Sequence, residues 1–134
     1  MSESTDPQAW VLRAEEDYLL CRSALRRKMP LLYGATFHAQ QCAEKYLKAL
    51  LVARDQVFPR THDLAALHDL CIQADLRVGV ELDQLERLNA YAVQMRYPGD
   101  DLIVMNWADY SHAHSIGVKH RPINVCPRSD RLFQ

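Results

Sequence analysis

The sequence predicts an all-α fold, an antiparallel up-and-down bundle of four to five helices. Apolar residues recur at spacings of three and four along most of the chain, which is the period of one face of a helix. No segment shows sustained alternation of apolar and polar residues, and proline or glycine interrupts the apolar pattern at intervals. We therefore expect a helical bundle over residues 1–121 and an irregular tail over residues 122–134.

The first helix is expected from about residue 7 to about residue 28. Asp6 followed by Pro7 is typical of a helix start, because the carboxylate caps the first turn and proline fits the first helical position. Met29-Pro30 ends the helix, since the residue before a proline is biased away from helical geometry. Its inward face collects Trp10, Ala14, Tyr18, Cys21, Ala24 and Leu25, and it also carries Asp17.

The second helix is expected from Gly34 to about residue 54. At 100° per residue it separates into an apolar face and a polar stripe made of Gln41, Glu44, Lys45 and Lys48. Glu44 and Lys48 stand four residues apart in the order that favours an ion pair. Such a stripe is most often a solvated surface, and the alternative is a set of ligand contacts.

Three further helices follow. Asp63 is a plausible N-cap for a helix that reaches about residue 74. Val78-Gly79 separates it from a helix over about residues 80–96, which Pro98-Gly99 stops. Residues 106–119 can form a last helix.

Composition narrows the class of protein. Lys and Arg number 16 against 17 Asp and Glu, so no overall positive field exists to hold a nucleic acid. No segment has the length of a membrane span and the first residues are polar, so we expect a cytoplasmic protein without a membrane partner. The four cysteines lack CxxC spacing, so we expect free thiols in a reducing compartment. Cys21, Cys42 and Cys71 stand among apolar residues and are expected to be buried.

Asp17 poses a specific problem, because a buried carboxylate needs a cation or several donors. Arg96, near the end of the fourth helix, is a candidate, and Asn89 stands seven residues before it on the same helix face. Two alternatives stay open. Arg96 either pairs with Asp17 inside the bundle or, with Tyr97, forms an anion site at the helix end.

The histidines give no clear catalytic site. His62 precedes an N-cap, where a structural hydrogen bond is the simpler role and general-base chemistry the alternative. A metal site built from His112, His114, His120 and Cys126 is disfavoured, because His-x-His on a helix points the two rings apart. We expect no metal and no cofactor, and we assign no catalytic residue, since the common enzyme motifs are absent from the sequence.

Several sequence pieces, in this order and spacing, resemble the prokaryotic HEPN domain family over about residues 7–101. They are the first helix with its inward Asp17, the run Gln40 to Ala49, Thr61-His62-Asp63-Leu64, Leu88-Asn89-x-Tyr91 and Arg96-Tyr97-Pro98. The resemblance implies a helical bundle that forms a homodimer and is often encoded beside a minimal nucleotidyltransferase in a toxin–antitoxin or defence pair. It also implies nucleotide binding, and in many members metal-independent cleavage of RNA by an arginine followed, after four to six residues, by a histidine.

The chain departs from that ribonuclease pattern. The positions where the histidine belongs after Arg96 hold Asp101, Leu102 and Ile103. The leading hypothesis is therefore a non-catalytic HEPN protein that binds a nucleotide, a nucleotidyltransferase or both. The alternatives are a ribonuclease that cleaves single-stranded RNA with Arg96 and either His62 or His112, and a structural scaffold. The candidate ligand contacts are Arg96, Tyr97, Asn89, His62, Lys45 and Lys48, and the candidate structural polar residues are Asp17, Glu44 and Asp63.

Overall fold

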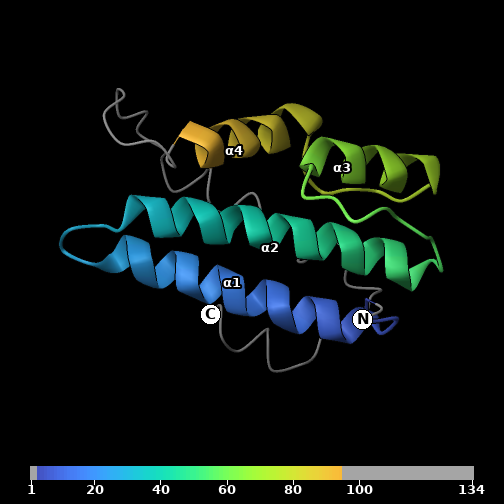
Figure 1. The fold of residues 1–134 in the computed structure, drawn as a ribbon, viewed down its shortest axis with the longest axis horizontal. Coiled ribbons are helices and arrows are strands. Elements are labelled where there is room, and N and C mark those ends of the chain that lie inside the picture. Colours follow the sequence, from blue (N-terminus) through green and yellow to red (C-terminus); the bar gives the residue numbers. More distant parts are fainter. Residues whose placement is uncertain (1–2, 95–134) are drawn as a thin grey trace.

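The computed structural model describes residues 3–94, and within them it confirms the predicted all-α bundle (Figure 1). The helices of this part of the chain are α1 (Pro7–Arg26), α2 (Leu32–Ala53), α3 (Leu64–Gln73) and α4 (Leu82–Gln94). The expected helix over residues 106–119 and the tail over residues 122–134 lie outside the described residues.

α2 is the central helix of the described bundle. It packs against each of the other three helices, and its contact with α1 is the most extensive. α1 runs antiparallel to α2 along one side, whereas α3 and α4 lie one after the other along the opposite side (Figure 1). α1 and α4 are thus separated by α2, and residues on α1 find their main partners on α2.

The helix starts follow the predicted capping chemistry at two of the sites. The Asp6 carboxylate accepts a hydrogen bond of 3.0 Å from the backbone N–H of Gln8, and Pro7 is the first residue of α1. The Asp63 carboxylate accepts from the backbone N–H groups of Ala65 and Ala66. The N-cap prediction for Asp63 is therefore confirmed.

The start of α2 differs from the prediction. The helix begins at Leu32 and includes Gly34, which was expected to open it. A Cβ added at Gly34 would meet nothing within 4 Å, so the position does not require glycine. The N-cap is Leu31, whose side chain makes no capping hydrogen bond, while its backbone N–H donates to the carbonyl of Ala24.

Two helices end in the left-handed turn of a Schellman motif. Asp55 and Asp75 follow the C-caps of α2 and α3 with φ values of 53° and 57°. After α2, the N–H of Gln56 donates to the carbonyl of Leu51 at 2.9 Å, which satisfies an otherwise unpaired helix end. Leu76 makes the same bond to Cys71 after α3.

The core lies between α2 and its neighbours. Its largest fully buried side chains include Leu47 and Leu51 of α2, Leu64 and Leu67 of α3, and Leu85 of α4. Cys21, Cys42 and Cys71 are free and buried, as the sequence predicts, and Cys126 lies outside the described residues. Burial raises the pKa of Cys21 and of Cys71 to about 12, and raises that of Cys42 well above its ordinary value.

We predict that Leu47→Ala lowers the free energy of unfolding by about 2–5 kcal/mol, because it leaves a cavity in the core. Leu12→Ala is the matched control, since Leu12 is 57 % exposed whereas Leu47 is fully buried. Its effect should be about 0.5 kcal/mol or less. Urea unfolding of both variants measures the difference, and equal effects would contradict the packing described for α2.

The buried thiols should resist alkylation. The thiolate is the reactive form, so iodoacetamide at about pH 8 should label Cys21 and Cys71 at least about 100-fold more slowly in the native protein than in urea. Because folding raises both pKa values from 9.0 to about 12, the stability that these groups contribute is intact below pH 9.0 and is lost as the pH rises toward 12. Peptide mass spectrometry gives the labelling rates, and equal rates in both states would refute the burial.

Candidate functional site

The polar stripe of α2 is largely covered, and the expectation that it is solvated is wrong for two of its residues. Glu44 is 3 % exposed and Lys48 is 4 % exposed. The reason is tertiary, because Trp10 of α1 and Phe58 of the loop between α2 and α3 both lie against Lys48. The stripe forms two charged clusters, one around Lys48 and one around Asp17.

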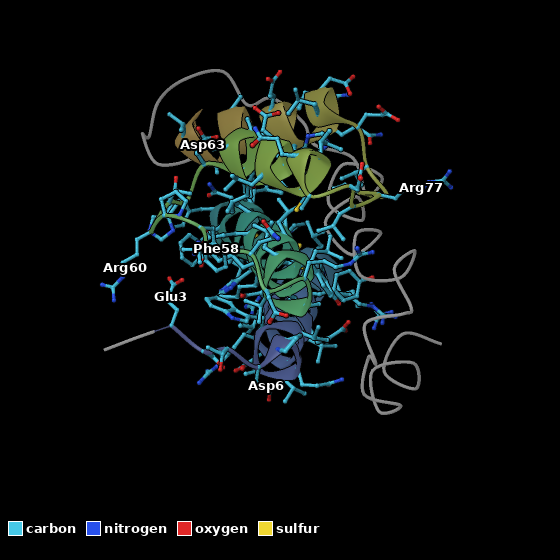
Figure 2. All side chains as sticks on the ribbon, turned by 90° about the vertical axis from the view of Figure 1, so that its right-hand side faces the viewer. Glu3, Asp6, Phe58, Arg60, Asp63 and Arg77 are labelled. Atoms are coloured by element: carbon cyan, nitrogen blue, oxygen red, sulfur yellow. The ribbon has the colours of Figure 1, made fainter. Side chains whose placement is uncertain are left out.

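The Lys48 cluster consists of Glu3, Trp10, Glu44, Lys48, Phe58 and His62. The ammonium of Lys48 lies 3.0 Å from Oε1 of Glu44, as the four-residue spacing predicts, and 3.8 Å from Oε1 of Glu3. Figure 2 shows Glu3, from the segment before α1, on the same side of the bundle as Phe58. Three segments that are distant in the sequence thus meet at one buried cation.

Aromatic rings complete the surroundings of that cation. The ammonium lies 5.3 Å from the ring centroid of Trp10 and 5.7 Å from that of Phe58, both within cation–π range. The two rings meet edge to face with centroids 6.2 Å apart. Lys48 is therefore held by charge and by π-faces together, and little of it is open to a ligand.

His62 stands at the outer edge of this cluster. Its Nδ1 lies 3.0 Å from Oε2 and 3.1 Å from Oε1 of Glu44, so an Nδ1–H donates to the carboxylate. The His62 side chain is 81 % exposed, whereas the Glu44 side chain is 4 % exposed. With Nδ1 bonded to Glu44, the Nε2 atom of a neutral His62 is an acceptor.

The Asp17 cluster joins α1 to the other end of the stripe. The Asp17 side chain, 9 % exposed, forms an ion pair with the ammonium of Lys45 and accepts a hydrogen bond of 2.8 Å from Nδ1 of His38. Beside it, the hydroxyl of Tyr46 donates to the buried carboxylate of Glu15. Burial above all, and then the charges of Glu15 and Asp17, raise the pKa of Cys42, which keeps this thiol protonated.

Among the described residues, the partners of Asp17 come from α2, whereas the sequence pointed to Arg96 near the end of the fourth helix. α2 separates α1 from α4, so the nearest donors to Asp17 are the α2 side chains His38 and Lys45. Arg96 and Tyr97 lie outside the described residues. Asn89 does lie within them, on the α4 face that contacts α2, where its Oδ1 accepts a hydrogen bond of 3.1 Å from Nε2 of Gln40.

Sequence reasoning missed His38 as a member of the site. It stands seven residues, or two helical turns, before Lys45, which places both on one face of α2. That spacing was the available signal. Glu3 had no such signal, because it precedes α1 and reaches Lys48 only through the tertiary fold.

The charge balance limits what these clusters can do. Lys45 is balanced by Asp17, and Lys48 faces two carboxylates. Neither cluster therefore has an excess positive charge for a phosphate group. Among residues 3–94, no three His, Cys, Asp or Glu side chains stand close enough to hold a metal ion, and the four metal candidates of the sequence lie beyond them.

Comparison with protein families gives a match over most of the chain. The model of a family described as the HEPN domain matches residues 7–116. Comparison with curated proteins and with solved structures gives no match.

We predict that Glu44→Gln lowers the free energy of unfolding by about 3 kcal/mol, because it removes the closest counter-charge of a buried lysine. Glu16→Gln is the control, since Glu16 pairs with Arg13 at 3.9 Å on the surface, and it should have almost no effect. The double variant Glu44→Gln/Lys48→Met should recover most of the loss. Urea unfolding measures all three. If Glu44→Gln behaves like Glu16→Gln, Lys48 is not buried as described.

Proposed function

Because the chain belongs to the HEPN domain family, we propose that it is a non-catalytic HEPN protein that binds a nucleotide, a minimal nucleotidyltransferase partner, or both. Its setting is a toxin–antitoxin or defence-type pair. The single observation that carries the proposal is the family match over residues 7–116. The charge balance on α2, where carboxylates already neutralise Lys45 and Lys48, limits which cation can contact a phosphate. Recognition of a phosphate must then rest on another cation.

Arg96 is that cation in the proposal. A guanidinium stays charged and presents paired donors that match phosphate oxygens. Arg96 follows Asn89 by seven residues, and Asn89 is fixed to α2 through Gln40. Tyr97 and the exposed ring of His62 complete the proposed contacts. Lys45 and Lys48 contribute indirectly, by holding the carboxylates that position α1 and His62.

The sequence supports the proposal that the protein is not catalytic. No arginine of this chain has a histidine after four to six intervening residues. Of the three positions after Arg96 where that histidine would stand, the first holds Asp101, and a carboxylate there repels a phosphate. His62 and His38, the histidines of the two clusters, both direct Nδ1 at a carboxylate.

We further propose that the protein acts as a homodimer in the cytoplasm. The three cysteines among residues 3–94 are free and buried, which fits a reducing compartment. Light scattering of the purified chain tests the dimer. Co-purification with the product of a neighbouring nucleotidyltransferase gene tests the partner.

Titration of the purified protein with ATP and with GTP tests nucleotide binding. We expect binding to at least one of them, and Arg96→Ala should weaken it about 10- to 100-fold because charge-assisted hydrogen bonds are lost. Arg77→Ala is the control, since Arg77 is exposed in the loop between α3 and α4 and projects from the opposite side of the bundle to Arg60 (Figure 2). The nucleotide affinity of the Arg77→Ala variant should equal that of the wild type. Equal affinity of Arg96→Ala, or no binding by the wild type, would contradict nucleotide binding through Arg96.

Incubation of the metal-free protein with single-stranded RNA tests the absence of catalysis. We expect the RNA to stay intact. Cleavage that disappears in Arg96→Ala would instead establish the ribonuclease alternative.

A further inference from the structure

The end of the α1–α2 hairpin exposes apolar side chains. We define the hairpin tip as residues 20–37, which include the last turns of α1, the loop and the first turns of α2. Met29 is 81 % exposed, Tyr33 55 % and Leu31 51 %. Leu20 and Phe37 are exposed by 44 % and 39 %. Figure 1 shows the tip at the end of the molecule opposite the N-terminus, beyond the last described turn of α4.

The same region concentrates positive charge. Residues 18–43 contain no Asp or Glu and carry Arg22, Arg26, Arg27 and Lys28. The whole chain has a net charge of −1, so the residues outside this segment together carry −5. An anionic surface therefore attracts the tip and repels the remainder, which orients the molecule tip first.

The helix dipole of α1 explains only part of this concentration of positive charge. Arg26 lies in the last turn of α1, where a cation interacts favourably with the helix dipole. Arg27 and Lys28 follow in the loop, and all three are exposed. The dipole gives no reason for Met29 and Leu31 to remain exposed beside them.

We propose that the hairpin tip is a peripheral membrane-contact surface, which docks on bilayers that contain anionic phospholipids. Met29 and Leu31 enter the boundary between head groups and acyl chains, and Tyr33 lies at the level of the head groups. Arg26, Arg27 and Lys28 contact the lipid phosphates. The tip is the convex end of a hairpin, a shape that meets a planar surface without obstruction from α3 or α4 (Figure 1).

Two other occupants fit the tip less well. Single-stranded nucleic acid could stack on Tyr33 and Phe37, but it offers nothing to the aliphatic side chains of Leu20, Met29 and Leu31. A second copy of the chain in a two-fold contact would place the same cations against one another.

A surface contact of this kind needs no spanning helix. Within residues 3–94, no helix has both the length and the apolar character to cross a bilayer. The sequence-based expectation of no membrane partner rested on the lack of a span, and it does not address docking of an exposed loop.

Co-sedimentation of the full chain with lipid vesicles tests the proposal. The vesicles contain either phosphatidylcholine alone or phosphatidylcholine with about 30 % phosphatidylglycerol. We expect binding only to the anionic vesicles, with a loss when the salt concentration rises from about 0.1 M to about 0.5 M. Arg27→Gln and Lys28→Gln should each lower the partition coefficient about fivefold.

Two further variants test the apolar contribution. Met29→Ser and Leu31→Ser should each weaken binding severalfold. Leu31 is the N-cap of α2 and lacks a side-chain cap, so we expect serine there to favour the helix. The matched controls lie elsewhere on the molecule. Val57→Ser removes a side chain that is 93 % exposed beyond the other end of α2, and Arg77→Gln removes an exposed cation.

Vesicle binding that the four tip variants lower and the two controls leave unchanged would support the proposal. Three outcomes would overturn it: no binding of the wild type to anionic vesicles, tip variants that bind like the wild type, or tip-dependent binding of an oligouridylate without vesicle binding. Nucleotide affinity should be unaffected in the tip variants, so this proposal and the nucleotide proposal fail independently.

Discussion

The requirement that a buried carboxylate must meet a cation or hydrogen-bond donors organises this structure. Asp17 of α1 and Glu44 of α2 lie in low-dielectric surroundings, where an isolated ionised group costs several kcal/mol. Asp17 is met by Lys45 and Glu44 by Lys48, both from the polar stripe of α2. His62 adds a further contact to Glu44 from the loop that leads to α3. These pairs fix α1 and that loop against the central helix.

The same pairs decide what the stripe can do for a ligand. Two lysines on one helix face resemble a phosphate-binding surface in the sequence, but in the fold their charge is matched by carboxylates. The polar motif of α2 therefore serves the architecture of the HEPN domain first. Ligand recognition in our account falls to Arg96 and to the exposed edge of His62. The side chains that maintain the fold are therefore different from those that we propose to contact a ligand.

Local features were predictable from the sequence and tertiary partners were not. The helices, the N-caps Asp6 and Asp63, and the buried cysteines follow from periodicity and from backbone hydrogen bonding within a few residues. Periodicity shows that Glu44 lies on the polar face, but it cannot show that a loop and an aromatic ring cover that face. It also cannot identify the partner of Asp17, because the choice among distant cations depends on which helices are neighbours. Within the candidate site, the sequence predicted only the Glu44–Lys48 ion pair, because these two residues stand four apart on one helix.

A double-mutant cycle between Asp17 and Lys45 tests most directly whether internal carboxylates hold the lysines of α2. The free energy of unfolding is measured in urea for the wild type, Asp17→Asn, Lys45→Gln and the double variant. The structure predicts a coupling energy of about 1–3 kcal/mol, because the two side chains share one buried ion pair. If the effects of the two single substitutions on the free energy of unfolding add within about 0.3 kcal/mol, the ion pair does not form. Lys45 would then be available to contact a phosphate.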